Sequence, residues 1–338
     1  MRNAHSFMSC FASLLTLLVS ALIHLSGHAQ LSEKPSAQVL PKPESGRIER
    51  MANFPSQHVD ARHVDVWLPD NFESLKAAGQ RFNVIYMHDG QMLFDAQTTW
   101  NKQAWWVDKT ITRLMQSGQI APTLVVGVWN NCKYRHSEYF PQKHLQHLLP
   151  GPRQLLLEKA LQNKPQADAY LRFLVQELKP AIDQRYPTLA GPANTVLMGS
   201  SMGGLISVYA MNEYPHIFGG AAGLSTHWIG GHEANSHIPL AAYVYLRDHL
   251  APPQGHKIYQ DHGTTELDAL YAPYQIFVNQ IVRDKGYKEH GVQANFMTRV
   301  FEGTGHNEKH GPLDLRFPCC FYWVNDMTVS KATVAPWP

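Results

Sequence analysis

The chain has 338 residues, of which 44% are hydrophobic and 17% are charged, a balance typical of a compact globular protein and not of a disordered one. Its formal net charge is only +2, and the lysines and arginines are scattered along the chain. This composition excludes a basic nucleic-acid-binding stripe and an acidic tail, so we expect no nucleic-acid partner.

The N-terminus has the three-part layout of a secretory signal peptide. Arg2 precedes an apolar stretch over residues 7–23, and small residues at 26–29 come just before Gln30. We therefore expect residues 1–29 to be removed and the mature protein to be periplasmic or secreted. Polar residues interrupt the apolar stretch, which disfavours an uncleaved anchor, and we expect no stable membrane insertion after the signal is removed.

Cysteine usage leaves one question open. Loss of the signal peptide would remove Cys10 and leave Cys132, Cys319 and Cys320, an odd number that permits at most one disulfide. A bridge from Cys132 to Cys319 or to Cys320 and three free thiols both fit the sequence.

The rest of the chain alternates strand and helix patterns. Residues 30–46 are rich in Pro, Ser, Lys and Gln and are predicted to be a flexible leader, so that residues 47–338 form a single catalytic domain. Strands are predicted at residues 64–68, 82–87, 124–129, 195–198, 219–224, 257–259 and 294–301, and helices at 105–115, 167–184, 205–212, 271–285 and 313–324. This order predicts an α/β fold with a mostly parallel sheet and helices on both faces.

The strongest local motif is Gly-Ser-Ser-Met-Gly at residues 199–203, which lies between a predicted strand and a predicted helix. This context predicts a nucleophile elbow with Ser201 as the nucleophile, because the glycines allow a tight turn and the helix N-terminus favours negative charge. An ordinary Gly/Ser turn is the alternative, which Gly204 and the flanking elements disfavour.

A catalytic serine in such a fold needs a histidine later in the chain. His306 follows the last predicted strand, in a Gly-rich loop at residues 301–308, and is the expected base. His310 is the nearest competitor, but it lies further into the following segment.

The acid should lie in the loop after the strand at 257–259, where it would orient the imidazole and stabilise its cation. Asp261, Glu266 and Asp268 all occur there. Asp261 comes too early, Asp268 is favoured, and Glu266 is the alternative.

The loop at residues 88–95 directly follows a predicted strand and is expected to contribute to an oxyanion hole. One donor should be the backbone N–H of Met202, and the other that of Gly90 or Gln91. An ordinary turn at Asp89 and Gly90 is the simpler alternative.

Together, the segments 88–95, 199–204, 261–268 and 303–308 resemble the putative-esterase family of α/β hydrolases. That family includes enterochelin esterases, feruloyl and acetyl-xylan esterase domains, S-formylglutathione hydrolases and mycolyltransferases. The resemblance, over about residues 47–324, implies an α/β-hydrolase fold and a triad of Ser201, His306 and one acid. In some relatives the acid corresponds to Glu266, and in others, with Gly-Thr-x-x-Leu-Asp, to Asp268.

Other residue groups are less informative. His227, His232, His237 and Glu233 do not have the spacing of ligands one helical turn apart, so no metal is expected. Several aromatic residues could line a substrate pocket or simply pack in the core: Trp100, Trp105, Trp106, Trp129, Tyr139, Phe140 and Trp228.

The sequence therefore predicts a serine esterase that hydrolyses a carboxylic ester through an acyl-serine intermediate, without metal or organic cofactor. An acyltransferase or thioesterase of the same fold and a catalytically dead binding protein are the alternatives. The substrate is expected to be a small-molecule or polysaccharide-linked ester, and the sequence determines neither its acyl group nor the oligomeric state.

Overall fold

The computed structural model describes residues 39–231, 233–308 and 311–323. The expected signal peptide, Cys10, His232 and His310 lie outside these residues. From Leu40 onward the described residues belong to one compact unit. Within the described part of the chain, no helix is both long and apolar enough to cross a membrane.

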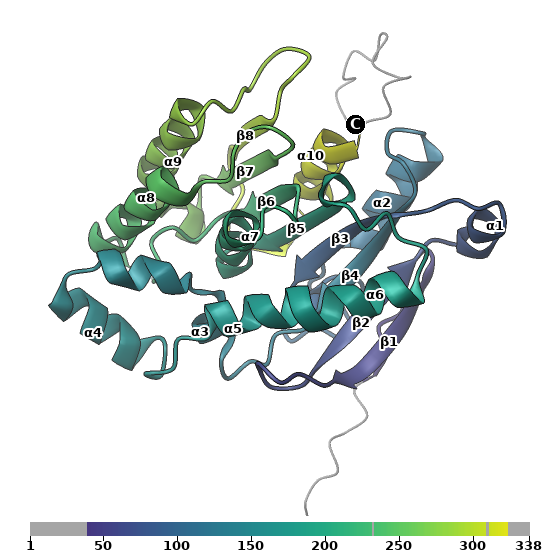
Figure 1. Cartoon of the computed structure of the whole chain (residues 1–338), viewed down its shortest axis with the longest axis horizontal. Helices are drawn as coiled ribbons and strands as arrows, with labels where there is room; N and C mark the ends of the chain where they lie inside the picture. The colour runs from purple at the N-terminus through teal and green to yellow at the C-terminus, as the bar shows by residue number, and fades with distance from the viewer. Residues whose placement is uncertain (1–38, 232, 309–310, 324–338) are drawn as a thin grey trace, which may run out of the picture. The chain divides into compact units, whose positions relative to one another are not determined.

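An eight-stranded sheet forms the centre of this unit, in the order β1-β2-β4-β3-β5-β6-β7-β8 (Figure 1). Its strands are β1 (Arg47–Phe54), β2 (Arg62–Leu68), β3 (Asn83–His88), β4 (Thr123–Val128), β5 (Thr195–Ser200), β6 (Gly220–Leu224), β7 (Lys257–Gly263) and β8 (Phe296–Phe301). β1 and β2 pair antiparallel at one side, and β4, β3, β5, β6, β7 and β8 run parallel. The mostly parallel sheet is as predicted.

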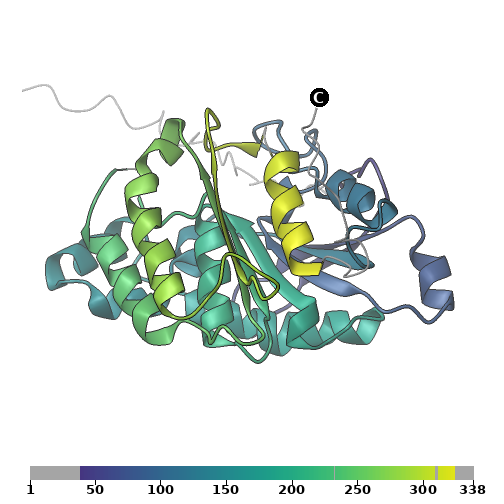
Figure 2. The same ribbon diagram turned by 90° about the horizontal axis from the view of Figure 1, so that it is seen from above.

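Helices cover both faces of the sheet (Figure 2). They are α1 (Phe72–Ala77), α2 (Val107–Gln116), α3 (Arg135–Tyr139), α4 (Pro150–Lys159), α5 (Ala167–Arg172), α6 (Lys179–Arg185), α7 (Met202–Glu213), α8 (His237–His249), α9 (Ala272–Asp284) and α10 (Gly311–Trp323). α2 and α10 pack on one face, and α5 to α9 contribute to the core on the other.

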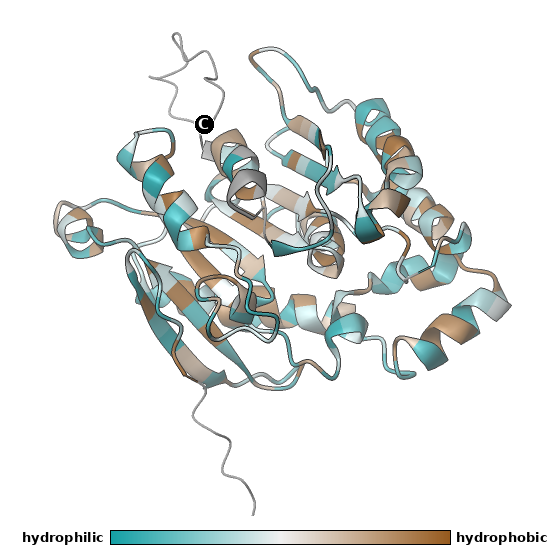
Figure 3. Cartoon of the chain, turned by 180° about the vertical axis from the view of Figure 1, so that it is seen from behind, coloured by the Kyte–Doolittle hydropathy of each residue, from teal (hydrophilic) through white to brown (hydrophobic). Residues whose placement is uncertain are grey.

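Successive side chains of a strand point to opposite faces of the sheet, which explains how one sheet supports two cores. In β3, Val84 and Tyr86 join the core beneath α5 to α9, whereas Ile85 and Met87 join the core beneath α2 and α10. Because both faces are covered, the central strands are apolar throughout, and every residue of β4 is buried. Apolar segments accordingly gather on the strands in Figure 3.

Some elements were not predicted from the sequence. β1 is missing from the prediction because it is an edge strand with charged, partly exposed residues, which hide the period-two signal. The last residues of the expected leader, 42–46, contact the domain. The backbone N–H groups of Lys42, Glu44 and Gly46 donate to side-chain carboxylates of the domain, at distances of 3.0, 2.7 and 3.0 Å.

The structure pairs none of the three cysteines that it describes. Cys132 is exposed, Cys319 is buried, Cys320 is half-buried, and all of them are free thiols. The disulfide considered from the sequence is therefore absent.

Candidate active site

Ser201 occupies a strained turn between β5 and α7. Its backbone angles are φ 59° and ψ −121°, a conformation that L residues rarely adopt and that the surroundings must maintain. Its N–H donates to the Leu224 carbonyl at 2.8 Å. A Cβ on Gly199 would lie 2.6 Å from the carbonyl carbon of Gly203, so only glycine fits beneath the first turn of α7. The geometry is that of the predicted elbow.

His306 lies in the loop after β8 and is oriented by a carboxylate. Its Nδ1 donates to Asp268 Oδ1 at 2.6 Å, while 21% of the His306 side chain and 1% of the Asp268 side chain are exposed. Asp268 comes from the short 3-10 helix η5 (Glu266–Leu270), directly after β7. Because β7 and β8 are parallel neighbours, the two loops leave the sheet at the same edge.

The second oxygen of Asp268 is also held. Its Oδ2 accepts hydrogen bonds from the Ser225 hydroxyl at 2.5 Å and the Gly263 N–H at 2.7 Å. Burial acts to raise the pKa of the Asp268 carboxyl, but the bonds from His306, Ser225 and Gly263 outweigh it and hold that pKa below its ordinary value. Asp268 is thus an ionised carboxylate in a fixed orientation.

The other two candidate acids have different partners. Glu266 Oε2 accepts a hydrogen bond from the Asn307 side chain at 3.2 Å. Asp261 lies within β7 and accepts the Ser225 N–H at 2.9 Å. Of the three carboxylates, Asp268 is the one that the structure pairs with His306.

Tyr271 is a residue of this site that the sequence did not single out. It lies three positions after Asp268, its ring meets the His306 ring edge-on with centroids 5.7 Å apart, and it is 1% exposed. Its hydroxyl is 2.6 Å from His227 Nδ1 and lies near the Ser201 side chain. Burial raises the pKa of this hydroxyl. The signal that could have found it is its spacing, since residues three apart share one side of a 3-10 helix.

The loop after β3 lies beside the first turn of α7, as an oxyanion hole requires. A Cβ on Gly203 would lie 3.3 Å from the Cβ of His88 and 3.5 Å from Asp89 Oδ2. Gly90 packs against β4 so closely that a Cβ there would lie 2.5 Å from the carbonyl carbon of Gly127. Met202, the first residue of α7, has an N–H without an intrahelical acceptor.

The remaining candidates have structural surroundings. No group of three potential ligands for a metal occurs among the residues described, and His227 instead contacts Tyr271. Tyr139, Phe140 and Trp228 are core residues, each at most 1% exposed. Trp100 is 85% exposed, and its neighbour Asn101 donates to Glu308, two residues after His306, at 3.0 Å.

Comparison with known proteins identifies the relatives of this chain. The family model described as "Putative esterase" matches residues 57–308. The uncharacterized protein YjcH of Bacillus subtilis (strain 168) is 23% identical over 178 residues, which cover 52% of this chain and 60% of YjcH.

Solved structures have the same fold. A ferulic acid esterase superimposes with a TM-score of 0.57 at 17% identity, covering 82% of this chain and 97% of the esterase. The enterobactin esterase FES from Shigella flexneri, studied in the presence of enterobactin, gives a TM-score of 0.60 at 17% identity and covers 84% of this chain and 60% of FES. At these identities the likeness shows the fold, and the predicted α/β-hydrolase fold is confirmed. Since the family model spans most of the described residues, the chain belongs to the putative-esterase family.

Proposed function

We propose that this protein is a serine esterase that hydrolyses a carboxylic ester through an acyl-serine intermediate. Its membership of an esterase family supports ester hydrolysis as the activity. The observation that carries the mechanism is the 2.6 Å hydrogen bond between His306 and Asp268, in a site where Ser201 occupies a strained elbow.

In the proposed mechanism each residue has one role. Asp268 fixes the His306 tautomer with its proton on Nδ1, which leaves Nε2 to take the Ser201 proton as the serine attacks the ester carbonyl. The oxyanion would be bound by the N–H of Met202 and that of Gly90 or Gln91. His306 then protonates the leaving alcohol, and water, activated by the same histidine, releases the acid and regenerates Ser201.

The test is a panel of acetyl, butyryl, feruloyl, thioester and siderophore esters, together with labelling by a fluorophosphonate probe. We expect labelling at Ser201 and turnover of at least one oxygen ester. Absence of labelling would favour a binding protein. Faster transfer to an added alcohol than to water would favour an acyltransferase, and turnover restricted to the thioester would favour a thioesterase.

The substrate is expected to be a small-molecule or polysaccharide-linked ester. Two of the structural neighbours are an esterase of ferulic acid and an esterase of enterobactin, so both chemistries belong in the panel. The panel also determines the acyl preference, because specificity depends on pocket shape.

A further inference from the structure

Asp89 is the residue directly before the two expected oxyanion donors, and its backbone is left-handed, with φ 57° and ψ 46°. Aspartate tolerates this conformation better than most residues, but the conformation is still sparsely populated. Contacts around Asp89 must therefore maintain it. A change in these angles would redirect the N–H groups of Gly90 and Gln91, because both follow Asp89 in the chain.

Both oxygens of the Asp89 carboxylate are bonded by residues that follow β4. Arg135 Nε donates to Oδ1 at 2.8 Å and Arg135 Nη2 donates to Oδ2 at 2.7 Å, the two-pronged geometry that fixes orientation most strongly. Asn130 Nδ2 donates to Oδ1 at 2.6 Å. Burial acts to raise the pKa of the Asp89 carboxyl, but Arg135 and Asn130 outweigh it and hold that pKa below its ordinary value.

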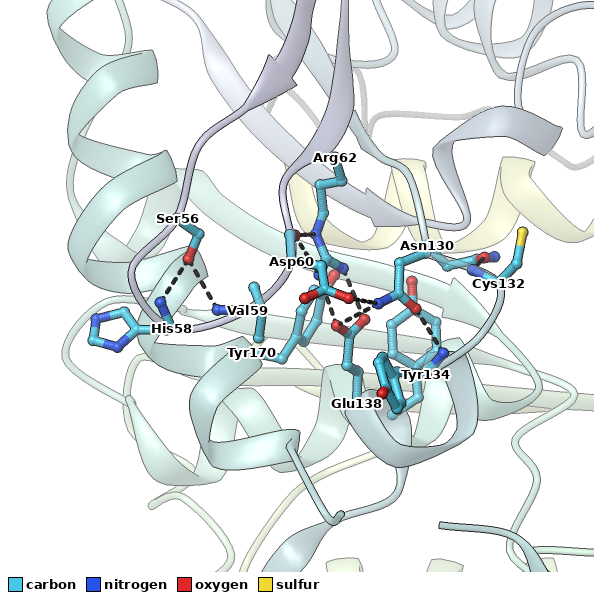
Figure 4. Close-up of polar contacts among 12 residues, drawn as sticks. Ser56, His58, Val59, Asp60, Arg62, Asn130, Cys132, Tyr134, Glu138 and Tyr170 are labelled. Atoms are coloured by element: carbon cyan, nitrogen blue, oxygen red, sulfur yellow. Dashed lines mark hydrogen bonds and ion pairs between the residues drawn. The ribbon is translucent and has the colours of Figure 1, made fainter. Parts of the chain in front are cut away.

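The helix that carries Arg135 is itself positioned by a second ion pair. One turn later on α3, Glu138 accepts hydrogen bonds from Arg62 Nη1 at 2.8 Å and Nη2 at 2.7 Å (Figure 4). The exposed fractions of the Arg62 and Glu138 side chains are 1% and 0%. Because this pair ties α3 to β2, the start of α3 has a defined position from which Arg135 reaches Asp89.

The loop that carries Asn130 is also held by its own side chains. Asn130 Oδ1 accepts the N–H of Cys132 at 2.7 Å. Asn131 Oδ1 accepts the N–H of Tyr134, also at 2.7 Å. In addition, the N–H of Asn130 donates to the Gln91 side chain at 3.3 Å. Asn130 therefore contacts the oxyanion loop at two residues, Asp89 and Gln91.

We propose that Asp89, Asn130 and Arg135 form a clamp that positions the oxyanion donors Gly90 and Gln91. The inference rests on the proposed esterase function and adds positioning residues to it, which act through the loop and not on the substrate. The Arg135 guanidinium forms an ion pair with the Asp89 carboxylate, and Asn130 donates a further hydrogen bond to the same carboxylate. A clamp of this kind contributes to transition-state binding and not to ground-state binding.

The test compares Asp89→Asn, Arg135→Gln and Arg135→Lys in the full chain, using 4-nitrophenyl acetate and a trifluoromethyl ketone that forms a hemiketal with the serine. Asp89→Asn suits the purpose because asparagine also tolerates the left-handed conformation, so that the change mainly removes the charge. We expect kcat to fall about 10- to 100-fold with KM nearly unchanged, and the ketone inhibition constant to rise by a similar factor. Arg135→Lys should have kcat and ketone inhibition values between those of the wild type and Arg135→Gln, because lysine keeps the charge but cannot make the two-pronged contact.

Lys143→Gln is the matched control. It breaks the Lys143–Glu213 ion pair, whose side chains are 36% and 16% exposed, close to the 32% and 13% of Arg135 and Asp89. We expect this variant to lower the melting temperature without changing kcat or ketone inhibition.

Two outcomes would overturn the proposal, and they are distinguishable. If the wild-type protein neither reacts with a fluorophosphonate nor turns over any ester, the proposed function fails and the clamp fails with it. If the wild type is active but Asp89→Asn and Arg135→Lys, both folded by thermal melting, keep wild-type kcat and ketone inhibition, the clamp alone is wrong. In this second outcome, a fall in kcat no larger than that of Lys143→Gln is scored as wild-type kcat.

Discussion

Asp268 Oδ1 lies 2.6 Å from His306 Nδ1, although the two residues are 38 positions apart in the chain. The parallel pairing of β7 with β8 brings their following loops together, and Ser225 fixes the far oxygen of the carboxylate. The pairing makes Asp268, and not Glu266, the carboxylate placed to orient the histidine.

The first prediction tests this assignment. Asp268→Asn should lower turnover by up to about ten-thousandfold, because an amide can stabilise the wrong imidazole tautomer. Glu266→Gln should have a small effect, since Glu266 contacts Asn307 instead. Steady-state rates are compared, with thermal melting as the folding control. A large loss in Glu266→Gln with an active Asp268→Asn would transfer the acid role to Glu266.

The second prediction concerns the nucleophile and the base. Ser201→Ala and His306→Ala should each reduce turnover of an activated ester by several orders of magnitude while leaving the fold intact. Ser200→Ala is the control, because Ser200 is the last residue of β5 and precedes the elbow position. An active Ser201→Ala variant alongside an inactive Ser200→Ala variant would show that the elbow is misassigned.

Site residues were predicted from the sequence where the motif that marks them lies in neighbouring residues of the chain. Ser201 could be placed because strand, glycines and helix are contiguous, and His306 because it follows the last strand in a Gly-rich loop. The acid stayed open between Asp268 and Glu266, since the sequence does not say which side chain turns toward His306. That direction is set by η5 and by the bonds to Ser225, which is distant in the chain.

In the fold, too, features with a local sequence signal were predicted, and features that depend on distant residues were not. Buried strands such as β4 are continuous apolar runs and were predicted within a residue or two. β1 was missed because its stability comes from pairing with β2, while its own side chains are charged or exposed. Arg135 and Tyr271 were missed for a related reason. Each acts through a partner far away in sequence, Asp89 and His227 respectively, and no local pattern marks such pairs.

The third prediction is that Tyr271→Phe lowers kcat about tenfold. The change removes the hydroxyl that lies 2.6 Å from His227 Nδ1 and near Ser201, and about 1.4 kcal/mol of transition-state stabilisation corresponds to a factor of ten. The ring that packs against His306 is retained. Tyr287→Phe is the matched control, since it deletes another buried hydroxyl, bonded to the Ala251 carbonyl at 3.0 Å. Equal kcat values for the two variants would assign Tyr271 a packing role only.

The fourth prediction is export, which rests on Arg2, the apolar stretch at residues 7–23 and the small residues before Gln30. N-terminal sequencing of periplasmic or secreted protein should begin close to Gln30. An intact Met1 on soluble cytoplasmic protein would contradict this expectation.

The last prediction concerns stability at mildly acidic pH and a histidine outside the site. His144 is 2% exposed and packs against Tyr209 and Tyr245, with ring centroids 6.2 and 4.9 Å away. Burial lowers its pKa from 6.5 to about 3, and the nearby His147 and His249 act in the same direction.

The direction of this pH effect on the free energy of unfolding follows from proton binding. Below pH 6.5 the unfolded chain protonates this imidazole while the folded protein does not, so the free energy of unfolding decreases as the pH falls from 6.5 toward 3. The loss is about 1.4 kcal/mol per pH unit, or about 2 kcal/mol by pH 5. His88, with a pKa lowered by burial to about 4, should contribute similarly in this range.

His144→Phe should therefore retain about 2 kcal/mol more of its pH 7 stability at pH 5 than the wild type does, because the titrating group is gone and an aromatic ring still fills the site. Urea unfolding at the two pH values measures this difference. His290→Gln is the control, since His290 is exposed and meets water in both states. If His144→Phe and the wild type lose the same stability between pH 7 and pH 5, then His144 is not buried as a neutral imidazole in solution.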